Sequence, residues 1–121
     1  MLVYCCSDLI FATKIASTAE AVQVVARPAR NAEMLRARLD QVDDGKANGP
    51  VSVLMVDLDL GDAAFDLIAQ AATHPAPPHI IAFGPHVLAA ALAKAKDVGA
   101  DAAMTRGAFT AQLPELIRAA G

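Results

Sequence analysis

The stretch of sequence that decides the fold is Val51-Ser52-Val53-Leu54-Met55-Val56-Asp57-Leu58-Asp59-Leu60-Gly61. Apolar residues, several of them β-branched, dominate it up to residue 56, and a carboxylate follows at once. A strand without an alternating polar face is typical of the middle of a parallel sheet that is covered on both sides. In such sheets, ligand sites lie at the carboxyl ends of the strands. Asp57 is therefore the first candidate for chemistry.

Strand-like and helix-like segments alternate on either side of this stretch. We expect strands at residues 2–6, 22–25, 51–56, 79–83 and 101–105, and helices over about 8–19, 31–42, 62–72, 87–98 and 109–120. Ser7 or Asp8, Asn31 and Asp62 are expected to cap the first three helices, because such side chains accept hydrogen bonds from free backbone N–H groups. Residues 43–50 are predicted to form a turn-rich loop. The alternation predicts a parallel sheet with helices on both faces.

Length, charge and composition restrict the class of protein. The 121 residues are expected to form one domain, residues 1–121, without an output domain. The net charge of −3 and the lack of a basic cluster speak against nucleic-acid binding. Apolar runs fall short of the ~18 residues that indicate a membrane span, so we expect a cytoplasmic protein. Cys5 and Cys6 are expected to be buried small hydrophobes, since neighbours on a strand point to opposite faces.

Along essentially its whole length, this pattern resembles the receiver domain of bacterial response regulators. Members of that family have five βα units with an acid ending the third strand, the position that Asp57 occupies here. The resemblance implies an α/β fold: the (βα)5 flavodoxin-like, or CheY-like, three-layer sandwich, with a parallel five-stranded sheet of order 2-1-3-4-5. It also implies a site at the carboxyl edge of that sheet, with Asp57 as the phosphoacceptor.

Other positions of the family's site carry different residues in this chain. The acidic pair that closes the first strand and holds a divalent cation matches Ser7 and Asp8, so one carboxylate is lost. The hydroxyl residue that ends the fourth strand matches Gly84, and the lysine after the fifth strand matches Arg106. The family's switch aromatic on the fifth strand matches Ala103. These differences predict an atypical receiver, or pseudo-receiver.

The carboxylates that remain define the expected metal chemistry. Mg²⁺ prefers oxygen ligands, commonly one or two carboxylates plus water. Asp8 and Asp57 are the candidates for a weak Mg²⁺-type site, and Asp59 is the further acid near them in sequence. We expect Mg²⁺ to bind with low affinity, and no other cofactor is implied.

Arg106, Gly84 and His86 are the candidates for contact with a phosphoryl group or another anion. A planar guanidinium can pair with a carboxylate through two nitrogens, whereas lysine acts as a point charge. We therefore expect an Asp57–Arg106 ion pair that neutralises the acceptor without a metal. His86 follows the fourth strand and is placed at the same edge of the sheet.

The function predicted from these residues is that of a stand-alone receiver-like signalling module that binds a protein and is not an enzyme. The partner is expected to be a histidine kinase or a downstream signalling protein, with a homodimer through the fifth strand and the fourth and fifth helices as a further possibility. One alternative is a conventional single-domain response regulator that is phosphorylated on Asp57 in a two-component phosphorelay. Another is a module that binds a small ligand or an anion at the strand edge through Arg106 and His86.

Overall fold

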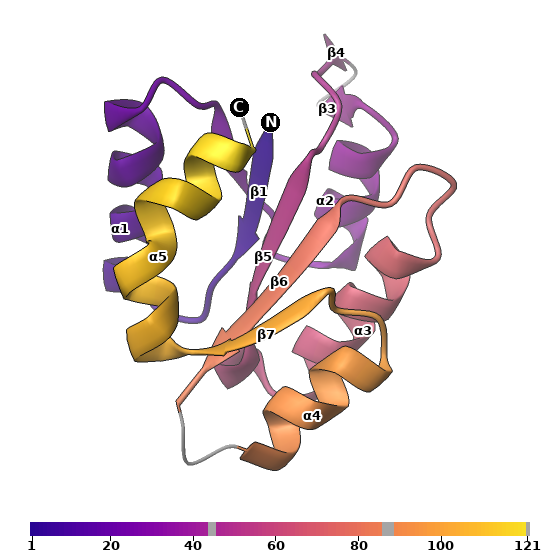
Figure 1. Ribbon diagram of the computed structural model, residues 1–121. Helices are drawn as coiled ribbons and strands as arrows, with labels where there is room; N and C mark the ends of the chain where they lie inside the picture. The colour runs from indigo at the N-terminus through magenta and orange to yellow at the C-terminus, as the bar shows by residue number, and fades with distance from the viewer. Residues whose placement is uncertain (44–45, 86–88, 121) are drawn as a thin grey trace.

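A five-stranded parallel sheet forms the centre of the computed structural model, which describes residues 1–43, 46–85 and 89–120 (Figure 1). Across the sheet the strands are β2 (Ala26–Pro28), β1 (Leu2–Cys5), β5 (Val53–Asp57), β6 (His79–Gly84) and β7 (Ala102–Thr105). Counted along the chain, this is the order 2-1-3-4-5 that the sequence predicts. All neighbouring strands run parallel. The carboxyl ends of the strands therefore meet at one edge of the sheet, the edge that carries Asp57.

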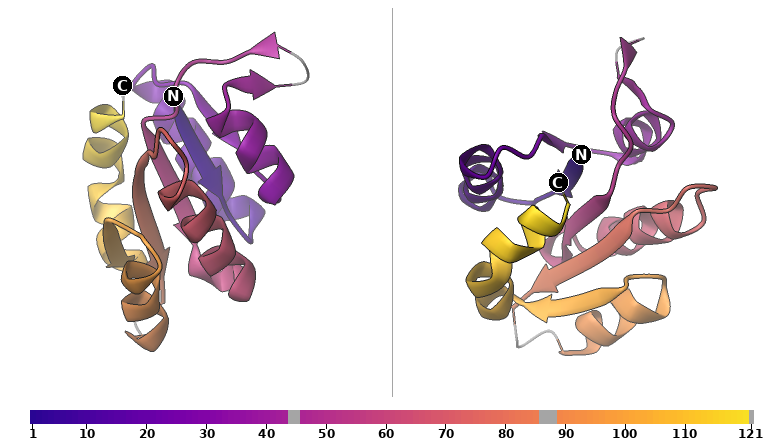
Figure 2. Two further views of the ribbon diagram at one scale, coloured as in Figure 1. Left: turned by 90° about the vertical axis from the view of Figure 1, so that its right-hand side faces the viewer. Right: turned by 45° about the horizontal axis from the view of Figure 1, so that its top comes forward.

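Helices cover both faces of this sheet, which gives three layers (Figure 2). One face carries α1 (Leu9–Ala21) and α5 (Arg106–Ala119), and the other carries α2 (Ala32–Leu39), α3 (Asp62–Ala72) and α4 (Ala89–Asp97). The predicted alternation of strands and helices is thus confirmed. The first residues of the predicted fourth helix, 87 and 88, lie outside the described part of the chain.

Both hydrophobic cores meet at β5, whose five residues are all buried. Val53 and Met55 face α1 and α5, whereas Leu54 and Val56 face the opposite layer. A polar side chain at any of these four positions would enter a closed apolar core. The strand can therefore place a carboxylate only at its end, which is where Asp57 stands, opposite Phe83 of β6.

The second strand does not lie where the sequence predicts it. Residues 22–25 were expected to be extended, but β2 covers Ala26–Pro28. Val22 instead caps the end of α1, and the N–H of Val24 donates to the carbonyl of Ala19. The apolar residues after α1 thus end the helix before the chain enters the sheet. The second strand therefore begins at Ala26, later in the chain than predicted.

Two further boundaries differ from the prediction. The second helix was expected to reach residue 42, but α2 ends at Leu39, and the expected loop contains a short antiparallel pair, β3 (Val42–Asp43) and β4 (Lys46–Ala47). The last helix was expected to begin at residue 109, but α5 begins at Arg106. The Oγ1 of Thr105 caps α5 by accepting the N–H of Ala108 at 3.3 Å. A threonine can end a strand and cap the next helix. Because β-branched residues favour strands, the sequence pattern predicts only the first of these roles.

Side-chain caps fix the start of two other helices. Asp8 accepts the N–H of Phe11 at 2.6 Å, and Asn31 accepts the N–H of Met34 at 2.8 Å, as predicted. The third predicted cap was wrong: Gly61 takes that position, and Asp62 lies in the first turn of α3. Gly61 has a φ of 71°, which favours glycine, so the backbone rather than a side chain starts this helix.

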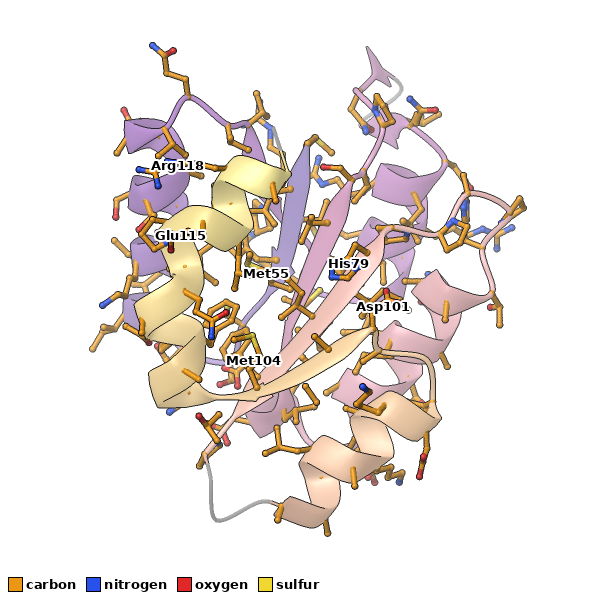
Figure 3. The ribbon with its side chains drawn as sticks, viewed as in Figure 1. Met55, His79, Asp101, Met104, Glu115 and Arg118 are labelled. Atoms are coloured by element: carbon orange, nitrogen blue, oxygen red, sulfur yellow. The ribbon has the colours of Figure 1, made fainter. Side chains whose placement is uncertain are left out.

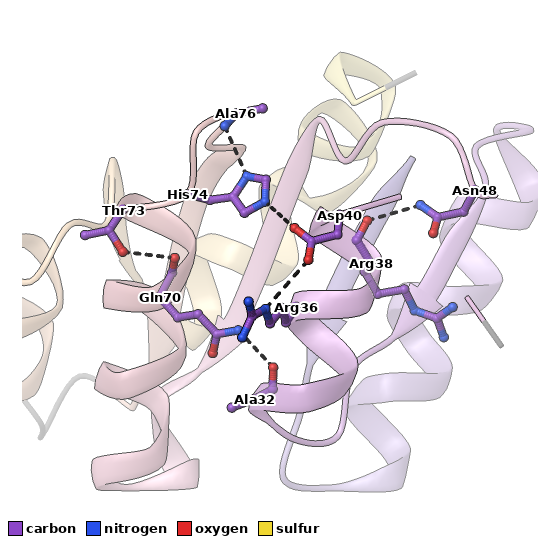
Figure 4. A network of polar contacts seen from close by, with 9 residues as sticks. All are labelled: Ala32, Arg36, Arg38, Asp40, Asn48, Gln70, Thr73, His74 and Ala76. Carbon is purple, nitrogen blue, oxygen red and sulfur yellow. Dashed lines mark hydrogen bonds and ion pairs between the residues drawn. The ribbon is translucent and has the colours of Figure 1, made fainter. Parts of the chain in front are cut away.

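A group of polar side chains joins α2 to α3 on the outer layer (Figure 4). His74 Nε2 lies 2.8 Å from Asp40 Oδ1, and Asp40 Oδ2 lies 3.7 Å from Arg36 Nε. The N–H of Ala76 donates to His74 Nδ1 at 3.0 Å, which leaves Nε2 to face Asp40. Gln70 adds a bond to the carbonyl of Ala32. We call Arg36, Asp40 and His74 the α2–α3 cluster.

The edge of the sheet opposite Asp57 is held by Asp101, which precedes β7 (Figure 3). Its Oδ2 accepts the N–H of Ile80 at 2.8 Å and lies 3.6 Å from His79 Nδ1. These contacts align the starts of β6 and β7.

None of the helices in the described ranges combines the length and the apolar character that a bilayer crossing requires.

Candidate functional site

Asp57 ends β5 with its side chain fully buried. Its Oδ2 accepts two hydrogen bonds from Ser7, one from the N–H at 3.1 Å and one from Oγ at 2.7 Å. Its Oδ1 accepts the N–H of Asp59 at 3.0 Å. A buried carboxylate is costly unless donors and a positive charge surround it. Here the donors come from the two loops that follow β1 and β5.

The positive charge comes from Arg106, the first residue of α5. Its Nη2 donates to Asp59 Oδ2 at 2.5 Å and lies 3.5 Å from Asp57 Oδ1. The predicted Asp57–Arg106 pair is therefore present, but it is not bidentate, because one nitrogen is shared between two carboxylates. The bond to Asp59 is the main cause that raises the pKa of Arg106 above its usual value. We call this arrangement of Arg106, Asp57 and Asp59 the arginine clamp.

The three carboxylates that are candidates for the cation site are each engaged by groups of the protein itself. Asp57 is enclosed by its donors, and Asp8 is exposed and engaged as the cap of α1. Asp59, the third candidate, is bonded to Arg106. Within residues 1–43, 46–85 and 89–120, no set of three or more His, Cys, Asp or Glu side chains is placed to hold a metal ion. The positive charge beside Asp57 and Asp59 is that of Arg106.

Gly84 ends β6 at the same edge of the sheet, paired with Thr105 of β7. A Cβ built on Gly84 would stand 3.2 Å from the Cβ of Leu58, a distance at which the neighbour must give way. The side chain of Leu58 therefore fills the space that a hydroxyl residue at position 84 would enter. His86, the other anion candidate after this strand, lies outside the described residues.

Three phenylalanines stack beneath the arginine clamp, and they come from three different elements. The ring centroids of Phe83 and Phe109 are 4.1 Å apart, and Phe11 stacks on Phe83 at 5.0 Å and on Phe109 at 5.8 Å. The guanidinium carbon of Arg106 lies 5.3 Å from the centroid of Phe11, within the range of a cation–π contact. Ala103 stands at the position that matches the family's switch aromatic and has no ring. The aromatic rings of the site come instead from the three stacked phenylalanines.

Cys6 lies between β1 and Ser7, next to the carboxylates. The pKa of its thiol is raised to about 12, mainly by burial and then by the charge of Asp57, while Arg106 opposes the shift. Burial also raises the pKa of Cys5 to about 12. Both cysteines are free thiols. At neutral pH each is therefore a protonated thiol and a poor nucleophile or metal ligand, as expected for small apolar side chains.

The sequence predicts Asp57, Arg106 and their ion pair, but not that Asp59 shares the guanidinium. Asp59 was expected at most as an accessory cation ligand, yet it is the closest partner of Arg106. Ser7 was read as a lost carboxylate, yet it supplies two donors to Asp57. Its position directly after the strand beside β5 was the signal that could have revealed this role, because the ends of adjacent parallel strands lie together.

Comparison with known proteins identifies the architecture. No protein-family model matches the chain, and no curated protein matches its sequence. Solved structures do match over nearly the whole chain. A response regulator from Thermotoga maritima has a TM-score of 0.72 at 13% identity, with 98% of this chain and 94% of that chain covered. The fold is that of a response-regulator receiver domain.

Two further structures share this receiver fold. The receiver domain of NtrX from Brucella abortus has a TM-score of 0.77 at 12% identity, covering 99% of this chain and 97% of that one. A response regulator protein from Burkholderia pseudomallei, solved with a phosphorylated aspartic acid, calcium ion and citrate, has a TM-score of 0.71 at 24% identity. It is covered over 64% of its length, against 98% of this chain. These similarities show a shared receiver fold among chains that differ at most positions.

Proposed function

We propose that this chain is an atypical receiver-fold signalling module that acts by binding a protein partner, with Asp57 neutralised by Arg106 in place of a divalent cation. The observation that carries the proposal is the arginine clamp around a fully buried Asp57. The partner is a histidine kinase or a downstream signalling protein, in the cytoplasm. The module turns over no external substrate.

The energetics of the clamp support this proposal. Asp57 has three short-range donors and one positive neighbour, so its charge is compensated by groups of the protein itself. A divalent cation that approached Asp57 would meet the guanidinium at 3.5 Å and would have to displace it. Mg²⁺ also keeps most of its water and requires octahedral geometry. We therefore expect Mg²⁺ affinity to be low.

The face made by β7, α4 and α5 is the surface proposed for the partner or for a second copy of the chain. β7 is an edge strand, and its four residues are only half-buried. α4 and α5 flank it on the two sides of the sheet (Figure 1). This face also contains the start of α5, where Arg106 meets the carboxylates. A partner that binds there is adjacent to the clamp.

An NMR titration of backbone amides with Mg²⁺ and then beryllofluoride tests the proposal. The wild type is expected to show no saturable shifts centred on Asp57, Asp8 and Arg106. Arg106→Lys is the matched variant, because lysine retains the charge but cannot reach two carboxylates with one planar group. Saturable shifts at these three residues in the wild type, at millimolar Mg²⁺, would overturn the proposal.

A second candidate is a conventional response regulator that is phosphorylated on Asp57. It is favoured by the position of Asp57 at the end of the central strand and by the phosphorylated aspartic acid of the Burkholderia neighbour. The two candidates differ in the role of Asp57 in binding. If the partner binds this module without phosphorylation of Asp57, the folded Asp57→Asn variant binds the partner with nearly wild-type affinity. Loss of binding in that folded variant would favour the conventional regulator.

A further inference from the structure

The first turn of α1, residues 9–12, carries the most exposed large apolar side chains among the described residues. Leu9 is 81% exposed and Ile10 is 85% exposed. Phe11, the next residue, turns inward and is half-buried on the phenylalanine stack. The same turn thus presents two apolar side chains to solvent and one to the site.

Two separate sets of contacts connect this turn to Asp57. In the first, Ser7 donates both its N–H and its Oγ to Asp57 Oδ2, and it stands immediately before Asp8, the cap of α1. In the second, Arg106 pairs with Asp57 and lies over the ring of Phe11. Asp8 completes the connection by accepting the N–H of Phe11.

Both connections depend on the same two oxygens. Any group that engages Oδ1 or Oδ2 of Asp57 competes with Arg106 or with Ser7, and each of these holds the start of α1. A group that displaces Arg106 also lets its Nε, which is buried without an acceptor among the described residues, reach water. Its guanidinium would then move away from Phe11 as well.

We infer that a group that engages Asp57 changes the structure of the first turn of α1. Arg106 and Phe11 are the coupled pair that transmits this change to Leu9 and Ile10. This goes beyond the proposed function, since it concerns where the site acts on the surface. It does not require β6 or β7 to carry a hydroxyl or an aromatic switch. It also holds whether or not a metal binds, and so its failure is distinguishable from failure of the Mg²⁺ titration.

Native-state amide hydrogen exchange of the full chain, without metal, tests the inference. Arg106→Ala is expected to speed exchange at the N–H groups of Phe11 and Ala12 by about tenfold, because loss of the cation–π contact and clamp loosens a helix terminus that opens locally. Protection at Leu54 and Met55 reports whether the fold is intact. Arg118→Ala is the control, because Arg118 lies on the same helix in an exposed pair with Glu115 (Figure 3).

Phe11→Leu and the double variant complete the cycle. Coupled residues give a double variant whose exchange rate is close to that of the faster single variant, whereas independent residues give multiplied rates. Multiplied rates, or a rate in Arg106→Ala equal to that in Arg118→Ala, would overturn the inference. Should Arg106→Ala not fold, Ser7→Ala tests the other connection, with about threefold faster exchange at Phe11 expected from loss of one hydrogen bond. Unchanged exchange in Ser7→Ala would then reject the inference.

Discussion

The arginine clamp and the α2–α3 cluster are both built from carboxylates and cations, but water reaches them very differently. Asp57 has no exposed surface, and the side chain of Arg106 is 34% exposed. In the α2–α3 cluster, Asp40 is 48% exposed and Arg36 is 79% exposed. Exposed pairs are screened and contribute about 0–1 kcal/mol, whereas a buried carboxylate that loses a partner cannot turn to water. The comparison shows why burial, more than the number of ion pairs, makes one cluster decisive for the fold.

Asp57→Asn against Asp40→Asn is the strongest test of this comparison. In Asp57→Asn the amide NH₂ must face a donor, either from Ser7 or from Asp59, so the free energy of unfolding is expected to fall by about 1–3 kcal/mol. Asp40→Asn still accepts the Nε2–H of His74, and we expect a loss below about 1 kcal/mol. Urea denaturation followed by circular dichroism measures both. Equal losses in the two variants would contradict the comparison.

Arg106→Met against Arg36→Met removes the cation from each cluster while keeping an unbranched stem. Arg106→Met leaves Asp57 with three donors and no positive neighbour, so a loss of about 1–2 kcal/mol in unfolding free energy is expected. Arg36→Met is expected to change stability by less than about 0.5 kcal/mol. The same denaturation experiment reports both values. A larger effect at Arg36 would show that exposure does not rank these pairs.

Alkaline pH tests the clamp's surroundings through Cys6, whose pKa is raised from 9.0 to about 12 in the folded protein. A group with a raised folded pKa contributes stability below its unfolded pKa and loses it as pH rises toward the folded pKa. The wild type is thus expected to lose stability between pH 9 and about 12 more steeply than Cys6→Ala. Urea midpoints from pH 8 upward measure the slopes. Equal loss of stability with pH in the wild type and in Cys6→Ala would show that burial does not raise the pKa of Cys6.

Salt gives the smallest expected difference. Raising NaCl to about 1 M shortens the Debye length to about 3 Å, which screens exposed pairs far more than buried ones. A double-mutant cycle on Arg36 and Asp40 is expected to lose its few tenths of a kcal/mol of coupling in high salt. The cycle on Arg106 and Asp57 is expected to keep most of its coupling. The reverse outcome would place the clamp in contact with bulk solvent.

The alternation of strands and helices could be predicted from the apolar runs and their spacing, whereas the strand order was implied by the resemblance to receiver domains. The errors fell where one residue serves two elements. Val22 ends a helix although its side chain suits a strand, and Thr105 ends a strand while it caps α5. Such choices are decided by a few backbone hydrogen bonds, which leave little trace in composition.

The sequence predicts which strand ends carry the site residues, but not all the side-chain contacts between them. Asp57 and Arg106 could be found because each follows a strand, and parallel strands end together. Whether Arg106 pairs with Asp57, with Asp59 or with both depends on the path of a side chain with several rotatable bonds. The same limit applies to Phe11, whose place under the guanidinium depends on how α1 packs beside α5.

The contact between Gly84 and Leu58 couples these two positions, because a side chain at position 84 would enter the space that Leu58 fills. A serine or threonine at position 84 places a Cβ 3.2 Å from Leu58 Cβ, so it is unfavourable while Leu58 is present. A smaller residue at position 58 first leaves a cavity in a buried position, because Leu58 is only 3% exposed. Each first step toward a hydroxyl residue therefore lowers stability, and only the pair restores it. A serine or threonine at position 84 is therefore expected to be tolerated only together with a smaller residue at position 58.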